Sequence, residues 1–181
     1  MPTNAPEAAA LVLRTMAAPD LPAYKALRDL LLAAHPEAFS SDAATERERA
    51  PETYLARIAG AGAAWPFTLT AWLGTRLAGA ITCEREARLK TRHIGQVVGM
   101  MVHPEARGMG IGRALVDGCI ARSRATGEVD LLTLSVTSGN EAATRLYERA
   151  GFMRYGRLER AIRIGGRYHA KELMMLDLSS A

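Results

Sequence analysis

The stretch from Val97 to Leu115, VVGMMVHPEARGMGIGRAL, constrains the fold of this chain more than any other. Its apolar run 97–102 is rich in β-branched side chains, which predicts a buried strand. Residues 103–109 contain proline and glycine and predict a loop, and a helix is expected from Gly110 onward. A strand, a loop and a helix therefore meet within one short segment.

The expected helix lacks the groups that usually satisfy a helix start. No Ser, Thr, Asp or Asn stands in the capping position near residues 108–110, and Arg113 adds positive charge where the helix dipole is already positive. The alternate glycines Gly108, Gly110 and Gly112 leave room for an outside partner, and a phosphate or pyrophosphate would suit these free N–H groups. The alternative is a plain tight turn whose N–H groups bond to water.

Two common phosphate-binding motifs do not fit this loop. The dinucleotide motif needs a glycine where Arg113 stands, and the nucleoside-triphosphate loop needs a Gly-Lys-Ser/Thr sequence that the segment lacks. The segment from Arg107 to Gly112, RGMGIG, instead resembles the Arg/Gln-x-x-Gly-x-Gly/Ala motif of the GNAT superfamily of acetyl-CoA-dependent N-acyltransferases.

A second segment, 138–152, reads SGNEAATRLYERAGF. On a helix, Asn140 and Tyr147 share one face and could meet one ligand. The residues alone leave a structural interpretation open, in which Ser138 and Glu141 form a capping box and Tyr147 is a core aromatic. The pattern Asn-x-x-Ala-x-x-Leu-Tyr-x-x-x-Gly-Phe also resembles the second half of the GNAT signature, at the expected distance after the first half.

Composition predicts an ordinary globular protein. With 181 residues, 49% hydrophobic and 23% charged, the chain is expected to form a single domain over 1–181, with residues 1–7 disordered. Cys83 and Cys119 show no metal or disulfide spacing, so no metal is expected and a reducing, cytoplasmic location is favoured. The sequence shows neither an apolar stretch of about 18 residues nor a secretion leader, so no membrane association is expected.

The formal charge of +4 is modest. Only 6% of residues are aromatic, and they are not interleaved with basic residues as in single-strand binders, so no nucleic-acid partner is expected. A phosphorylated cofactor would account for the positive charge.

The remaining elements follow from periodicity and turn residues. The order of a strand, the glycine-led helix and another strand indicates a βαβ unit, with parallel neighbouring strands and a ligand at their carboxyl ends. Residues 35–50 lack a clear pattern and are either a specificity loop or a solvated connector. Other strands are expected over 10–16, 66–73, 76–85, 131–136, 153–164 and 168–178, with helices over 20–34 and 51–60.

The last two expected strands surround Gly165 and Gly166, a glycine pair typical of a two-residue hairpin. Five arginines make this hairpin basic. It is either a solvated charged face or an arm that contacts a substrate or a second subunit. Symmetry statistics favour a homodimer.

The GNAT resemblance implies an α/β (α+β) fold, with a mixed twisted central sheet of about six to seven strands and helices on both faces. It implies that acetyl-CoA lies in the splay between two parallel strands, with Gly99 marking a bulge that opens the splay. Backbone groups would hold the pantetheine arm and the pyrophosphate. The cofactor-binding residues implied are Met100, Met101, Val102, Arg107, Gly108, Met109, Gly110, Ile111, Gly112, Arg113 and Asn140.

The resemblance also implies direct acetyl transfer to a primary amine, with Tyr147 as the catalytic residue near the cofactor sulfur. A phenol with a pKa of about 10 can protonate a departing thiolate whose thiol has a pKa of about 8.5. A proton acceptor is not identified, because Gln96 and Ser135 occupy the two positions where the family often has glutamate. A water held by either residue could relay the proton, or a side chain could substitute: Glu84, Glu86, His93 or His103.

The chain is therefore expected to be an acetyl-CoA-dependent N-acetyltransferase with a small-molecule amine as acceptor. One alternative is a protein or peptide N-terminal acetyltransferase. Another is a non-catalytic acyl-CoA-binding regulatory module, which needs no base. Both cysteines are expected to be buried, which argues against a covalent acyl-enzyme.

Overall fold

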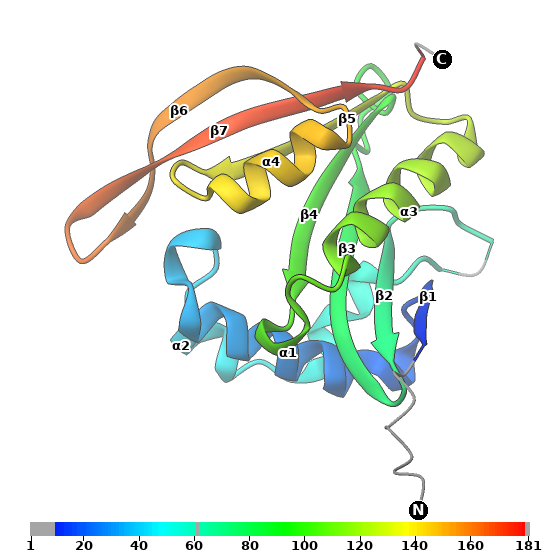
Figure 1. Ribbon diagram of the computed structural model, residues 1–181. Helices are drawn as coiled ribbons and strands as arrows, with labels where there is room; N and C mark the ends of the chain where they lie inside the picture. Colours follow the sequence, from blue (N-terminus) through cyan, green and yellow to red (C-terminus); the bar gives the residue numbers. More distant parts are fainter. Residues whose placement is uncertain (1–9, 61, 180–181) are drawn as a thin grey trace, which may run out of the picture.

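The computed structural model describes residues 10–60 and 62–179, and the segment 1–7, expected to be disordered, lies outside them. The described residues form one seven-stranded sheet in the order β1-β2-β3-β4-β5-β7-β6 (Figure 1). Among the described strands only β4 and β5 pair in parallel, so the predicted mixed sheet is confirmed. The strands are β1 Leu11–Thr15, β2 Phe67–Leu73, β3 Arg76–Arg85, β4 Ile94–Val102, β5 Leu131–Thr137, β6 Met153–Ile164 and β7 Arg167–Asp177.

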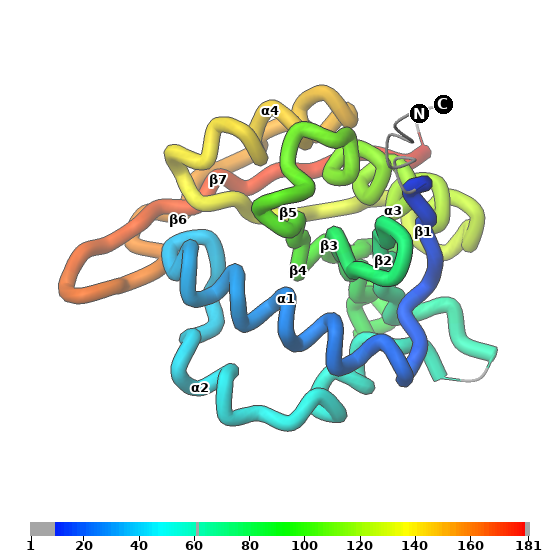
Figure 2. The backbone as a smooth tube through the Cα atoms, turned by 60° about the horizontal axis from the view of Figure 1, so that its bottom comes forward, coloured from blue at the N-terminus to red at the C-terminus, as the bar shows by residue number. Residues whose placement is uncertain are grey.

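Helices cover both faces of the sheet (Figures 1 and 2). On one face lie α1 (Leu21–Ala34) and α2 (Ala43–Arg47), and on the other lie α3 (Ile111–Thr126) and α4 (Glu141–Arg149). Each face has its own hydrophobic core. Tyr24, Leu31 and Met101 are among the buried residues under α1, whereas Leu115 and Met174 belong to the core under α3 and α4.

Two expectations for the segment between α1 and β2 need correction. Residues 35–50 are not simply a loop, because they contain η2 (Pro36–Ala38) and α2, which the Asp42 side chain caps by accepting a bond from the Thr45 N–H at 2.9 Å. The helix expected over 51–60 is the 3-10 helix η3 (Pro51–Arg57). Its only buried residue is Tyr54, so no apolar stripe supports a longer α-helix.

Strands β4 and β5 pair only at their beginnings, through Ile94, Gly95 and Gln96 of β4. Beyond these pairs the strands separate, while β5 stays paired with β7 along its whole length. On its other side, β4 shifts register against β3 near Gly99. The φ of this residue is 58°, a value that residues other than glycine rarely adopt. A Cβ there would clash with Nη1 of Arg57. The bulge predicted at Gly99 is therefore confirmed, and it lies where the splay opens.

No helix in the described part of the chain is both long and apolar enough to cross a membrane.

Candidate functional site

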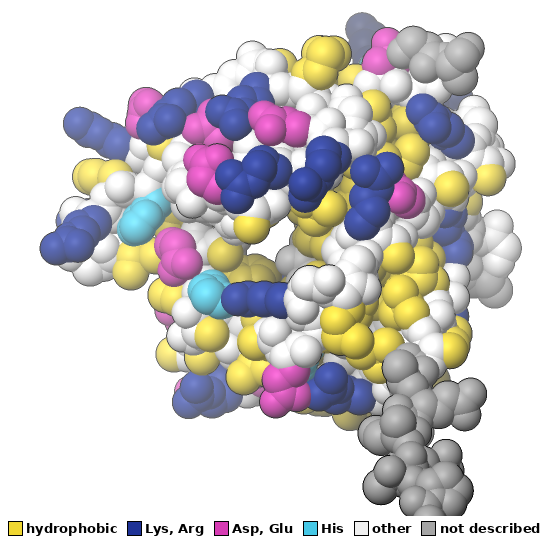
Figure 3. Space-filling view, viewed as in Figure 1, with side chains coloured by type: hydrophobic (Ala, Val, Ile, Leu, Met, Phe, Trp, Pro, Cys, Tyr) yellow, Lys and Arg dark blue, Asp and Glu magenta, His cyan; other side chains and the backbone are white. Residues whose placement is uncertain are grey.

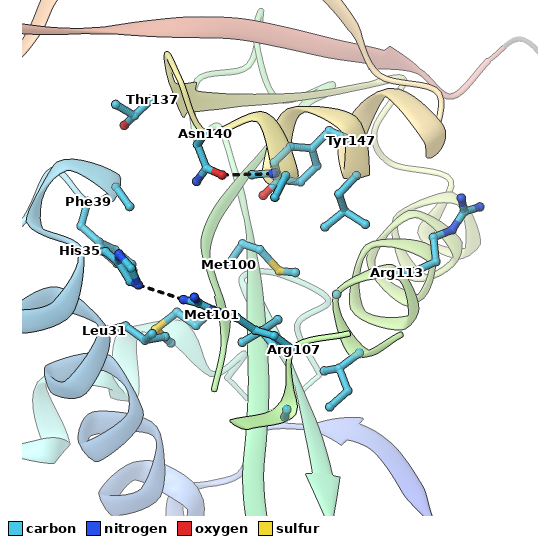
Figure 4. Close-up of a pocket in the computed structure, with 18 of the residues that line it drawn as sticks. Leu31, His35, Phe39, Met100, Met101, Arg107, Arg113, Thr137, Asn140 and Tyr147 are labelled. Carbon is cyan, nitrogen blue, oxygen red and sulfur yellow. Dashed lines mark hydrogen bonds between the residues drawn. The ribbon is translucent and has the colours of Figure 1, made fainter. Parts of the chain in front are cut away.

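A cavity of about 820 Å³ opens where β4 and β5 separate. Its walls come from the ends of β4 and β5, the loop before α3, the first turn of α3, the turn before α4, α4 along its length, and the segment from Leu31 to Phe39. The close-up shows β4 along its centre, with Phe39 and Thr137 at one end and Arg113 at the other (Figure 4). Lys and Arg side chains gather beside the hollow (Figure 3), and three arginines line it: Arg107, Arg113 and Arg149.

The structure brings most of the sequence-predicted site residues into this cavity. Tyr147 lines it, and so do these expected cofactor-binding residues: Met100, Met101, Val102, Arg107, Gly108, Gly110, Ile111, Gly112, Arg113 and Asn140. Met109 is the exception, because its side chain points to solvent with 55% of its surface exposed.

No side chain in the part of the chain that the structure describes caps the beginning of α3. Gly110 occupies the capping position with a φ of 77°, and no acidic residue stands in the first turn. Gly108 has a φ of 78°, and a Cβ at either glycine would meet nothing within 4 Å. Glycine is therefore needed at these two positions for its positive φ angle, not for lack of space. The first N–H groups of the helix stay open toward the cavity, an arrangement that suits an anion.

The Arg107 side chain reaches across the cavity to His35, at the end of α1 (Figure 4). Nη2 of Arg107 lies 2.9 Å from Nε2 of His35. Because a guanidinium only donates, Nε2 must accept, which assigns the ring proton of a neutral His35 to Nδ1. Nδ1 lies 3.7 Å from a carboxylate oxygen of Glu37.

Sequence reasoning missed His35 and Glu37 as cavity residues. They fall in the segment without a clear pattern, and only the packing of η2 against β5 brings them to the cavity. That packing includes a bond of 2.7 Å from the Thr137 hydroxyl to the Glu37 carbonyl oxygen.

Tyr147 projects from α4 into the cavity wall (Figure 4) and is only 6% exposed. Its ring packs edge-on against Phe152, with centroids 5.8 Å apart. Its hydroxyl has no hydrogen-bond partner among residues 10–60 and 62–179. Burial, with a smaller contribution from Cys119, raises the pKa of Tyr147 well above that of a free phenol. The side chain is therefore a protonated donor at neutral pH.

Asn140 has a structural role as well as a place in the cavity wall. Its Oδ1 accepts a bond from the Ala143 N–H at 3.1 Å and so caps α4. The capping box of Ser138 and Glu141 is not formed, because Gly139, with a φ of 91°, turns the chain so that Asn140 takes the cap. Ser138 instead donates to Glu172 at 2.6 Å. The amide NH₂ of Asn140 remains available to a ligand.

The candidate proton acceptors do not gather at the cavity. Gln96 and Ser135 are exposed and lie outside its lining. His103 accepts a bond from the Glu105 N–H through Nδ1 at 3.3 Å, which caps the 3-10 helix η4 (Pro104–Ala106). The other candidates are also absent from the lining: Glu84, Glu86 and His93.

The cysteines are buried behind the cavity lining and do not form part of it. Cys83 and Cys119 are free thiols with exposed fractions of 0% and 1%. Hydrogen bonding to Cys83 and burial raise the pKa of the Cys119 thiol, which makes it a poor nucleophile. In the described part of the chain, no three His, Cys, Asp or Glu side chains are grouped to hold a metal ion.

The sequence of this chain is similar to those of known acetyltransferases. Residues 24–152 match the model of the acetyltransferase (GNAT) family. N-alpha-acetyltransferase 30 of Schizosaccharomyces pombe is 33% identical over 97 residues, which are 53% of this chain and 64% of that protein. The mycothiol acetyltransferase of Thermobispora bispora is 47% identical over 62 residues, which are 34% of this chain and 21% of that protein. The chain thus spans about a fifth of the length of that relative.

A solved structure shares the fold. The structure of yncA from Salmonella typhimurium with its cofactor acetyl-CoA matches with a TM-score of 0.82 and 20% sequence identity. The match covers 95% of this chain and 96% of that one.

Proposed function

The chain belongs to the GNAT acetyltransferase family, and on that basis we propose that it transfers the acetyl group of acetyl-CoA directly to a primary amine, with a small molecule as acceptor. One observation carries this proposal. The separation of β4 from β5 creates a cavity that joins the free start of α3, the open edge of β4 and the Tyr147 side chain.

The cofactor would bind mainly through backbone groups. Amides from Gly108 to Arg113 would hold the pyrophosphate, because the start of α3 has no other cap. Met100 to Val102 have no partner on β5, so the pantetheine arm can pair with them as an added strand. Arg107 and Asn140 would contribute side-chain donors.

Transfer would begin when the neutral acceptor amine attacks the thioester carbonyl carbon. A tetrahedral intermediate forms, and an N–H of the β4 edge near Val102 can stabilise its oxyanion. The C–S bond then breaks, and the thiolate takes the phenolic proton of Tyr147 to leave as coenzyme A. We propose that water in the cavity removes the proton of the amine, since neither Gln96 nor Ser135 can take it.

A peptide N-terminus is the second candidate acceptor. The name of the Schizosaccharomyces pombe relative favours it. Leu31 and Phe39 give the cavity an apolar end that could accept a first side chain of a peptide. A single domain, a cytoplasmic location and a homodimer are proposals that rest on the sequence arguments alone.

Release of free thiol from acetyl-CoA tests the proposed function. The purified protein would be supplied with polyamines, aminoglycosides, amino acids and short peptides with free N-termini. Turnover on one class supports the transferase and identifies the acceptor. Tight acetyl-CoA binding without turnover on any amine favours the regulatory module, and no binding contradicts the phosphate-loop assignment.

A further inference from the structure

Lysine is rare in this chain. Among its 23 basic residues only three are lysines, Lys25, Lys90 and Lys171. Lys25 is paired with Asp29 on α1, and Lys90 is exposed in the connection between β3 and β4. Lys171, on β7, differs from both in its surroundings.

The backbone places Lys171 next to the cavity. It is the register partner of Thr137 on β5, and Thr137 lines the cavity. Its Nζ donates to the Ser40 hydroxyl at 2.8 Å, and the preceding residue, Phe39, also lines the cavity. Figure 4 shows Phe39 and Thr137 at the same end of the cavity, opposite Arg113. The Lys171 amine therefore lies beside this end of the cavity, next to two segments that line it, although Lys171 and Ser40 themselves are outside the lining.

The chemistry around Lys171 favours a reactive amine. The side chain is half-buried, and no carboxylate of the described residues forms an ion pair with it. Burial lowers the pKa of its ammonium, so a larger fraction is neutral than for a free lysine. Arginine at this position would keep a positive charge but could not serve as a nucleophile.

We propose that Lys171 is an internal acetyl acceptor, modified by the chain's own acetyl-CoA when no external amine occupies the cavity. This rests on the proposed transferase function. The neutral Nζ attacks the thioester carbonyl and loses a proton to water. The C–S bond breaks, and coenzyme A leaves as the thiol after taking the Tyr147 proton. The product is Nε-acetyl-lysine at position 171.

Acetylation would also alter the end of the cavity. It removes the positive charge that bonds Ser40, while the bond from Thr137 to the Glu37 carbonyl oxygen remains. The segment 36–40 would then lose a charge-assisted bond to β7 and keep its bond to β5.

The test uses the full chain with acetyl-CoA and no added amine, followed by mass spectrometry of the intact protein and its peptides. We expect one acetyl group per chain at Lys171, formed about 100-fold faster than at Lys90, because a positioned amine avoids a bimolecular encounter. Lys171→Arg should abolish this modification, and Lys90→Arg, the matched control, should not. Tyr147→Phe should slow it.

Three results would overturn the inference. Equal labelling of all three lysines, unchanged by Tyr147→Phe, would show ordinary chemical acetylation. Turnover of an external amine without label at Lys171 would reject the internal acceptor while leaving the proposed function intact. A protein that releases no thiol with any amine and acquires no label would reject both.

Discussion

At the scale of single residues, Tyr147 combines burial with a hydroxyl that has no partner among the described residues. We predict that Tyr147→Phe lowers kcat about 100-fold, within the usual range for loss of a proton donor. The Kd for acetyl-CoA should change much less, because the ring and its contact with Phe152 are kept. Steady-state kinetics with calorimetric binding would separate the two effects.

Tyr168→Phe provides the control for this variant, because Tyr168 is 52% exposed on β7, outside the cavity lining. An unchanged kcat for Tyr147→Phe would show that the Tyr147 hydroxyl is not the proton donor in acetyl transfer. The raised pKa of Tyr147 also predicts no loss of kcat from phenol ionisation between pH 7 and about pH 10, the pKa of a free phenol.

The two thiols allow a test of direct transfer. We predict that the Cys83→Ala, Cys119→Ala double variant keeps most of its turnover, because both thiols are buried outside the cavity. Some loss of stability is expected from the vacated core volume. A folded variant, verified by circular dichroism, with no acetyl transfer would instead implicate a covalent acyl-enzyme.

Sequence and structure agree on some site residues for a physical reason. Arg107, Asn140 and Tyr147 carry motif signals with fixed spacing along a loop or a helix, so each motif can be found in the sequence, and the parallel pairing of β4 with β5 brings the two motifs to one cavity. His35 and Glu37 could not be found in this way. They reach the cavity only because η2 packs against β5, a contact across 100 residues of sequence.

At the scale of elements, a substitution at the start of α3 can test whether its glycines are needed for their positive φ angles. We predict that Gly110→Ala destabilises the protein by about 1–2 kcal/mol, because its φ of 77° is costly for alanine. The Kd for acetyl-CoA should rise about 10-fold as the N–H groups shift. Denaturant unfolding and calorimetry would measure the two quantities.

Two glycines provide matched controls. Gly165→Ala places similar strain, at a φ of 53°, in the distant hairpin, so it should cost stability without changing Kd. Gly112 has no positive φ, and an added Cβ would lie 3.2 Å from a flexible Leu146 methyl group, so Gly112→Ala should bind nearly normally. Equal Kd values for Gly110→Ala and the wild type would contradict anion binding at this helix start.

Most elements could be predicted, because periodicity and glycine or proline turns are local signals. The strands expected over 76–85 and 153–164 match β3 and β6, and the helix expected from Gly110 begins one residue later. The residue that caps α4 was harder to predict from the sequence, because Ser138 and Asn140 are both suitable capping residues and only the turn at Gly139 selects Asn140. The insertion of β7 between β5 and β6 depends on contacts distant in sequence.

At the scale of the whole molecule, a buried ion pair joins the elements that cover the α1 face of the sheet. Glu46 of α2 accepts bonds from Arg28 of α1 at 3.1 Å and from Tyr54 of η3 at 2.6 Å. Burial alone would raise the pKa of Glu46, but the bonds from Tyr54 and Arg28 outweigh it and lower the pKa below its usual value. Folding is therefore linked to ionisation of this carboxyl group.

Because the pKa of Glu46 is lower in the folded state, its stabilisation is complete above the unfolded value of about 4.3 and declines as pH falls through the folded value. We predict that Glu46→Gln lowers the free energy of unfolding at pH 7 by about 3 kcal/mol, since Arg28 stays buried without its charge partner. The variant should also lose less stability than the wild type on acidification below about pH 5. Urea unfolding across this pH range measures both effects, and Glu105→Gln, in an exposed pair with Arg76, is the control. If the free energies of unfolding of Glu46→Gln and the wild type changed with pH in the same way, the Glu46 charge would not stabilise the packing of α1, α2 and η3, and apolar contacts alone would hold these helices to the sheet.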